Sequence, residues 1–266
     1  MNDYSLNELI ACVLAREVRD GDSLQCGANA VVQRSGFLLG HLDHGPNCRV
    51  LIGRTFANLW DVPVLQLYDM NVDWRAARWG EYVIPHDESF SWSSRRQISA
   101  FAIGALQTDK RGNTNMLGFG DDPKRLKVRG PGGVGTTPVS ARLDRYYIML
   151  RRHDRRALVD QCDFVSGIGF GDGPGAREKL GLPGGGPKLC ITPLCVFDFD
   201  EATKLMRIKS LHPGVTLQQV LDNTGFAPVV PKDIPTTPAP TERELHILRT
   251  RIDPKGVLRK VEAVEA

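Results

Sequence analysis

The sequence predicts an α/β fold in which a mostly parallel sheet is flanked by helices. Three segments near the start carry this prediction: a short strand over 23–27, a helix over 31–42 and a second strand over 49–52. This β–α–β order implies a parallel pair of strands joined by a helical crossover. The chain has 266 residues, 41% of them hydrophobic, and is long enough to bury a core without disulfide or metal crosslinks.

Capping motifs predict a helix at each end of the chain. Ser5 and Glu8 form a capping box before apolar residues at helical spacing, and Gly21 ends that helix. Thr241 and Glu244 form a second box after a proline-rich stretch over 228–240. We therefore expect an α/β domain over 1–226, followed by a proline-rich arm with a short helix over 227–266.

The middle of the chain holds further strand candidates. We expect strands over 126–129, 146–150, 164–165 and 205–210, one interrupted by Pro193 over 190–199, and a strand or short helix over 98–106. Eight glycines and three prolines in 169–188 predict a loop.

Composition argues against several functional classes. The net charge of +3 is too small for a dedicated nucleic-acid binder. No apolar run approaches the roughly 20 residues that span a bilayer, and residues 1–22 mix acidic and basic side chains rather than forming the apolar core of a signal peptide. Six scattered cysteines without a C-x-x-C pair predict reduced, buried thiols. We expect a cytoplasmic protein that binds neither nucleic acid nor membrane.

A glycine run is the first candidate functional feature. In Gly130-Pro131-Gly132-Gly133-Val134-Gly135, the missing Cβ atoms let backbone N–H groups converge on an anion. The run matches G-x-G-x-x-G, and Arg151 and Arg152 follow about twenty residues later, as in some dinucleotide sites. An oxyanion or thioester-carbonyl cradle, an NADP-type site and a plain turn remain open at this point.

Three polar clusters have simpler interpretations beside functional ones. The segment 109–115 is typical of a tight turn, although Asn113 and Asn115 could also fix a loop at a site. His41 and His44 lack further ligands at metal spacing, so we expect them to supply charge and capping at a helix end. The basic run 151–156 is typical of a solvated face, with contact to a phosphate as the alternative.

Several of these features, in this order, resemble the β subunit of family I CoA-transferases of the glutaconate type. The matching pieces are Glu8-Leu9, Asp20-Gly21-Asp22, Gly45-Pro46-Asn47, the 109–115 turn, Gly130-Pro131-Gly132-Gly133, the run 212–217 and Gly225-Phe226. The resemblance implies a Rossmann-like CoA-transferase fold and an acyl-CoA substrate. It implies no cofactor beyond the CoA that the substrate carries. It also implies a homologous α subunit that completes the active site at the interface, in an α2β2 heterotetramer.

One departure from the family changes the expected chemistry. In these transferases a glutamate attacks the acyl-CoA carbonyl, and the resemblance places that position at about Gly53. No acidic residue occurs between Asp43 and Asp61. Glycine offers no nucleophile, so covalent transfer from this position is excluded, and the vacated space suits a bulky acyl group. The chain most resembles a branch of the family, the actinobacterial cholesterol ring-cleaving hydrolases, which open a steroid-derived ring by hydrolytic C–C cleavage.

The sequence therefore predicts the β subunit of a ring-opening CoA-thioester hydrolase in cholesterol catabolism. The resemblance assigns the acid/base residue to the α subunit and leaves no catalytic residue or metal in this chain. The expected site residues are Gly130, Gly132 and Gly133 as an oxyanion or substrate loop, and Gly53, Arg54, Asn113 and Asn115 in the pocket. The alternatives are a true CoA-transferase with Glu81 or Glu88 as a displaced nucleophile, a non-catalytic partner subunit, and an NADP-dependent oxidoreductase.

Overall fold

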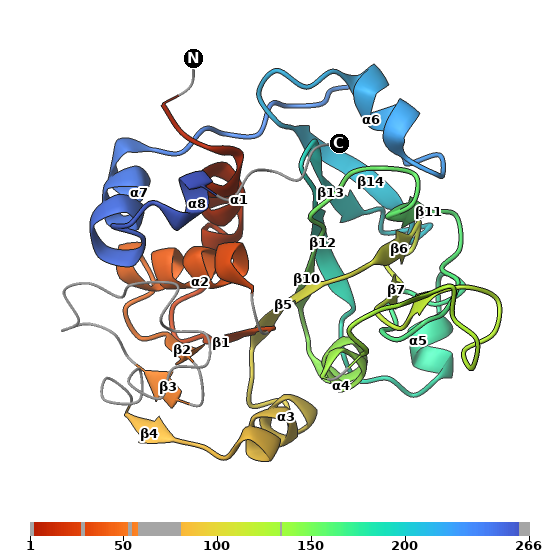
Figure 1. Ribbon diagram of the computed structural model, residues 1–266, viewed down its shortest axis with the longest axis horizontal. Helices are drawn as coiled ribbons and strands as arrows, with labels where there is room; N and C mark the ends of the chain where they lie inside the picture. Colours follow the sequence, from red (N-terminus) through yellow and green to blue (C-terminus); the bar gives the residue numbers. More distant parts are fainter. Residues whose placement is uncertain (1–2, 28–29, 53–54, 58–80, 134, 261–266) are drawn as a thin grey trace. The chain divides into compact units, whose positions relative to one another are not determined.

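The computed structural model describes residues 3–27, 30–52, 55–57, 81–133 and 135–260 (Figure 1). These residues form two compact units: residues up to 102 together with those from 238 onward make the first, and residues 103–237 make the second. The first unit is thus assembled from both ends of the chain. The boundary expected between residues 226 and 227 stays a prediction. In the described part of the chain, no helix is long and apolar enough to cross a membrane.

The sheet of the first unit confirms the predicted β–α–β start. β1(Ser23–Cys26) pairs in parallel with β2(Arg49–Ile52) and with β5(Ala100–Gly104), and α2(Val31–Asp43) connects β1 to β2. Antiparallel strands extend this sheet beyond β2. They are β3(Thr55–Ala57) and β4(Tyr82–Val83), and α3(His86–Ser94) follows them in the chain.

α1(Leu6–Ala15) begins at the predicted capping box. The Glu8 N–H donates to Ser5 Oγ (3.2 Å), and the Ser5 N–H donates to Glu8 Oε2 (2.8 Å). α1 packs closely on α2, and just beyond α1 a Cβ atom at Gly40 would lie 2.5 Å from Val18 Cγ2. Glycine at position 40 is therefore required for the two segments to touch.

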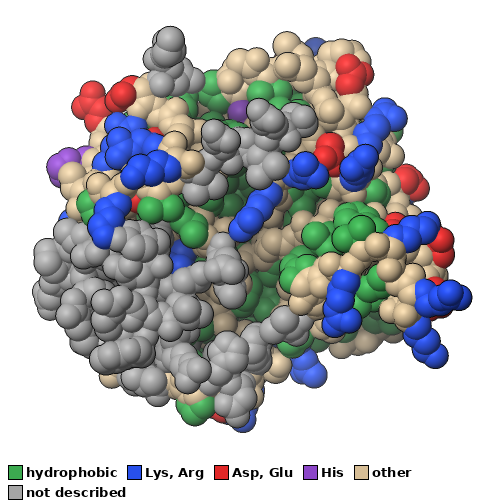
Figure 2. Space-filling model, in the orientation of Figure 1, with side chains coloured by type: hydrophobic (Ala, Val, Ile, Leu, Met, Phe, Trp, Pro, Cys, Tyr) green, Lys and Arg blue, Asp and Glu red, His purple; other side chains and the backbone are tan. Residues whose placement is uncertain are grey.

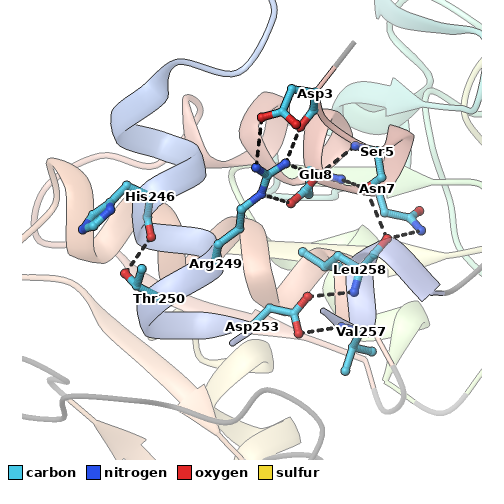
Figure 3. Close-up of polar contacts among 10 residues, drawn as sticks. All are labelled: Asp3, Ser5, Asn7, Glu8, His246, Arg249, Thr250, Asp253, Val257 and Leu258. Atoms are coloured by element: carbon cyan, nitrogen blue, oxygen red, sulfur yellow. Dashed lines mark hydrogen bonds and ion pairs between the residues drawn. The ribbon is translucent and has the colours of Figure 1, made fainter. Parts of the chain in front are cut away.

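The C-terminal segment returns to these first helices. It comprises α7(Glu242–Ile247), a π-helical turn η3(Leu248–Ile252) and α8(Val257–Lys260), and its capping box at Thr241 and Glu244 forms as predicted. α7 contacts α2, and α8 contacts α1. Figure 3 shows Arg249 reaching the buried Glu8 carboxylate (Nε to Oε1, 2.8 Å), while the Leu258 carbonyl accepts hydrogen bonds from Ser5 and Asn7. The C-terminal helices thus dock on the chain's own N-terminus.

The second unit is built around β10(Tyr146–Met149) and β12(Pro187–Ile191), which pair in parallel. β13(Cys195–Phe199) and β14(Met206–Leu211) continue antiparallel from β12. The apolar run 190–199 is therefore two strands, because Pro193 lies in the turn between them. The other elements are β6(Gln107–Asp109), β7(Thr114–Asn115), β8(Gly118–Phe119), β9(Val128–Arg129), β11(Leu158–Val159), α4(Thr136–Arg142), α5(Ala176–Lys179) and α6(Leu217–Asn223).

Three local features complete the comparison with the predicted elements. Residues 164–165 are not a strand, because the Ser166 and Gly167 N–H groups both donate to the Thr114 carbonyl and turn the chain across β7. The strand of this region is β11, which pairs in parallel with β6. The loop 169–188 contains one helical turn, α5, and the start of β12. The six cysteines are free, and all except Cys26 are buried.

Candidate functional site

The glycine loop, residues 130–135, connects β9 to α4 in the second unit. The Gly130 N–H donates to the Leu117 carbonyl (2.7 Å), and the Gly132 N–H donates to the Met116 carbonyl (2.9 Å). Gly132 has a φ of +88°, in the left-handed region that favours glycine. The first half of the loop is therefore fixed against residues 116–117, and two of its N–H groups are already used.

Gly133 differs from its two neighbours. Its carbonyl accepts hydrogen bonds from the Thr136 N–H (2.7 Å) and hydroxyl (2.5 Å), which hold the loop at the start of α4. Among the described residues, the Gly133 N–H has no acceptor. Of the three glycines expected to bind an oxyanion, Gly133 is thus the one whose N–H is available in this conformation. The roles of Gly130, Gly132 and Gly133 in binding an oxyanion stay predictions.

Asn113 is buried and joins two loops. Its Oδ1 accepts hydrogen bonds from the Gly169 (2.9 Å) and Gly171 (3.1 Å) N–H groups. Its Nδ2 donates to Asp109 Oδ2 (2.8 Å) and to the Gly171 carbonyl (3.1 Å). An amide offers two donors and two acceptor positions, and all four are used within the protein.

Asn115 is fully buried and shapes the chain that supports the glycine loop. Its Oδ1 accepts from the N–H groups of Leu117 (2.9 Å) and Gly118 (3.4 Å), and its Nδ2 donates to Gln107 Oε1 (2.7 Å) and the Gly118 carbonyl (2.8 Å). Like Asn113, it keeps no hydrogen-bonding capacity for a ligand. Both residues hold loops, and their contact with a substrate stays a prediction.

Two further residues complete this support, and nothing in the local sequence pointed to either. Gln107 Nε2 donates to Asp163 Oδ1 (3.0 Å), and the other Asp163 oxygen accepts from the Gly120 N–H (2.9 Å). Gln107 Oε1 also accepts from the Asp163 N–H (3.1 Å). These residues are 56 positions apart in the chain, so no local motif links them. Asn115, Gln107 and Asp163 together form a polar lock that fixes residues 115–120.

Comparisons with known proteins identify the family to which this arrangement belongs. The family model described as Coenzyme A transferase matches residues 70–223. A 3-oxoadipate CoA-transferase chain of Pseudomonas knackmussii, one of the B-type subunits, is 33% identical over 250 residues, which cover 94% of each chain. The chain belongs to the coenzyme A transferase family. This family member is also 35% identical to the cholesterol ring-cleaving hydrolase IpdB subunit of Rhodococcus jostii, over 175 residues that cover 62% of each chain.

The fold of this coenzyme A transferase family member matches a solved structure over almost its full length. Glutaconate coenzyme A-transferase from Acidaminococcus fermentans has a TM-score of 0.85 at 26% identity, over 97% of this chain and 98% of that chain. The predicted CoA-transferase fold is confirmed. The dinucleotide interpretation of the glycine run is not supported, because β9 pairs antiparallel with β8 and does not open a βαβ unit.

The expected nucleophile region of this family member is only partly visible. Gly53 and Arg54 lie outside the described residues. Of the displaced candidates, Glu81 is 41% exposed and lies 3.5 Å from Arg49 Nε. Glu88 Oε1 accepts hydrogen bonds from Trp92 Nε1 and Arg95 Nη1, each at 3.1 Å. Both carboxylates are thus paired with arginines near the surface.

The histidines of this family member are mostly structural. His41 is buried, with Nδ1 3.0 Å from the Gly45 carbonyl, and burial lowers its pKa. It therefore caps the end of α2 as a neutral group, and the charge expected there is wrong. Among the described residues, no group of three His, Cys, Asp or Glu side chains could hold a metal ion. His153, within the basic run 151–156, is buried rather than solvated.

Proposed function

We propose that this chain is the β-type subunit of a two-subunit enzyme that opens a carbon ring of a steroid-derived CoA thioester by hydrolytic C–C cleavage. The observation that carries the proposal is the stretch between Asp43 and Asp61, which has no carboxylate where the family resemblance places the nucleophile. The similarity to the ring-cleaving hydrolase subunit supports the substrate class. The six free thiols support a reducing, cytoplasmic location.

The proposed reaction uses a general base from the partner subunit. A partner carboxylate takes a proton from water, and the resulting hydroxide adds to a ring ketone of a β-dicarbonyl unit. The C–C bond between the former ketone carbon and the carbon that separates the two carbonyls then breaks. This step yields a carboxylic acid and an enolate, which is protonated to give the ring-opened CoA ester. The Gly133 N–H would donate to the enolate oxygen, since its hydrogen is not used elsewhere in the loop.

A second candidate is a true acyl-CoA:CoA transferase subunit. The full-length similarity to the 3-oxoadipate CoA-transferase chain favours it, because that alignment covers 94% of the chain. It requires a displaced nucleophile, and Glu81 and Glu88 are the acidic residues nearest to Gly53 in the sequence after the segment 61–73. A transferase passes through a glutamyl-CoA thioester, whereas the proposed hydrolase does not.

Trapping of that thioester separates the two functions. The co-purified two-subunit complex is treated with acyl-CoA and then with borohydride, and each glutamate peptide is examined by mass spectrometry. We expect no reduced glutamate in this chain. We also expect that a bicyclic β-diketone CoA ester in ¹⁸O-water incorporates one ¹⁸O atom into the new carboxylate of the ring-opened product.

Variants of the two displaced candidates provide the control. Glu81→Gln and Glu88→Gln should leave ring opening unchanged within about twofold, since neither group takes part in it. A reduced glutamate at either position, lost in the matching variant, would establish the transferase and overturn the proposal.

A further inference from the structure

We propose that the basic hairpin, residues 118–129, binds the phosphate groups of the CoA moiety and thereby places the thioester end at the glycine loop. This inference rests on the proposed function, because it concerns how that CoA ester is held. The hairpin consists of β8, β9 and the turn between them, and Gly130 follows it directly.

The charge of the hairpin is the first observation. Lys124, Arg125, Lys127 and Arg129 are all exposed, and only Asp121 and Asp122 oppose them. Lys127 pairs with Asp121 (3.3 Å), whereas in the described structure the side chains of Lys124, Arg125 and Arg129 have no hydrogen-bond or ion-pair partner. Figure 2 shows Lys and Arg side chains projecting from the right-hand edge of the molecule, where Figure 1 draws the loop between β7 and α4.

The rigidity of the hairpin base is the second observation. The polar lock holds it, through the bonds from Asn115 to Gly118 (2.8 Å) and from the Gly120 N–H to Asp163 (2.9 Å). A Cβ atom at Gly118 would lie 2.2 Å from the Val128 carbonyl, so the two strands close tightly. The adjoining residues 116–117 accept the Gly130 and Gly132 N–H groups. The hairpin and the first half of the glycine loop are therefore one rigid piece.

The exposure of β9 is the third observation. Both of its residues, Val128 and Arg129, are exposed, so neither side of the strand is covered within the described chain. CoA carries its diphosphate and 3′-phosphate at the end of the molecule opposite the thioester. A cationic arm joined rigidly to an acyl-binding loop matches this separation. Arg and Lys bind phosphate through charge-assisted hydrogen bonds.

Kinetics with matched substrates test the proposal on the two-subunit complex. Lys124→Gln, Arg125→Gln, Arg129→Gln and their triple combination are compared with Lys232→Gln, which removes an exposed lysine from the segment before α7. We expect KM for the CoA ester to rise roughly three- to tenfold in each single variant, with kcat unchanged. KM for the corresponding pantetheine thioester, which lacks the nucleotide, should not change. The triple variant should also lose most of the salt dependence of KM.

The remaining outcomes are decisive in either direction. An unchanged KM, or an equal rise with both thioesters, would overturn the proposal. Inorganic pyrophosphate should compete with the CoA ester in the wild type and not in the triple variant. Binding of pyrophosphate to the hairpin without competition would show a separate anion site and would also overturn it. Calorimetry with free CoA keeps this test independent of the reaction: weakened CoA binding in the triple variant without any ring opening would refute the proposed function and retain the hairpin.

Discussion

At Asn115 a single buried amide meets four partners, and each partner fixes part of the chain that leads into the glycine loop. Its contacts with Leu117 and Gly118 set the backbone whose neighbouring carbonyls receive the glycine N–H groups. The bond to Gln107 links this segment to Asp163. The residue therefore acts on the site through the loop it holds.

Asn115→Asp keeps the shape of the side chain and removes both of its donors. A carboxylate oxygen would then face Gln107 Oε1 and the Gly118 carbonyl, at the 2.7 and 2.8 Å now spanned by hydrogen bonds. We expect the free energy of unfolding to fall by about 2–4 kcal/mol, measured by urea denaturation. Asn223→Asp is the control, because that surface amide makes one bond to Gln219. Equal stability of the two variants would contradict the role of Asn115 in the lock.

Among the elements, α1 and the C-terminal helices form a block held by one buried carboxylate. Burial raises the pKa of Glu8, but hydrogen bonds from Arg249 and from the Ser5 N–H outweigh it, so the pKa lies below its ordinary value. Glu8 is 1% exposed and remains ionised because these partners surround it. Arg249 therefore connects the two ends of the chain electrostatically.

Removal of Arg249 should leave a buried, unpaired charge. We expect Arg249→Ala to lower the free energy of unfolding by about 2–4 kcal/mol, and Glu8→Gln in the same background to recover part of the loss. Arg243→Ala, in α7, is the matched control. Its ion pair with Asp43 is 71% exposed on the arginine side, so its loss should cost under about 1 kcal/mol. Thermal and urea unfolding of the four proteins measure this, and an equal loss in both arginine variants would contradict the buried pair.

The same elements show what local sequence can predict. α1, α2, β1 and β2 were predictable because capping residues and apolar periodicity act over neighbouring positions. The equivalent box at Thr216 and Gln219, which starts α6, carried the same signal and was overlooked. β6, β7, β8 and β11 are two or three residues long, too short to show a period, and their pairing depends on distant partners. The site follows the same rule: Asn113 and Asn115 were found by their turn, whereas Gln107 and Asp163 have no local signal.

At the scale of the whole molecule, two buried histidines connect distant parts of the second unit. His153 lies 2.8 Å from Thr192 Oγ1 and 3.1 Å from Thr224 Oγ1, which joins the segment before β11 to the β12–β13 turn and to the end of α6. His212 lies 2.9 Å from the Thr192 carbonyl and 3.0 Å from Thr237 Oγ1. Burial lowers the pKa of each to about 4. Both histidines are therefore neutral at pH 7 and must lose hydration to fold.

This neutrality predicts how the second unit responds to acid. Above pH 6.5 neither the folded nor the unfolded chain protonates these histidines, so their folded-state contribution is complete. Between pH 6.5 and about 4 the unfolded chain binds protons that the folded chain excludes, so stability falls as the pH is lowered. The slope approaches about 1.4 kcal/mol per pH unit for each histidine. Hydrogen exchange of β13 and β14, corrected for intrinsic rates, should therefore report a loss of about 3–4 kcal/mol between pH 7 and pH 5. His153→Gln should remove about half of that loss, and His246→Gln, at an exposed position of α7, should remove none. If His153→Gln keeps the wild-type slope, the acid response of this unit arises from carboxylates instead.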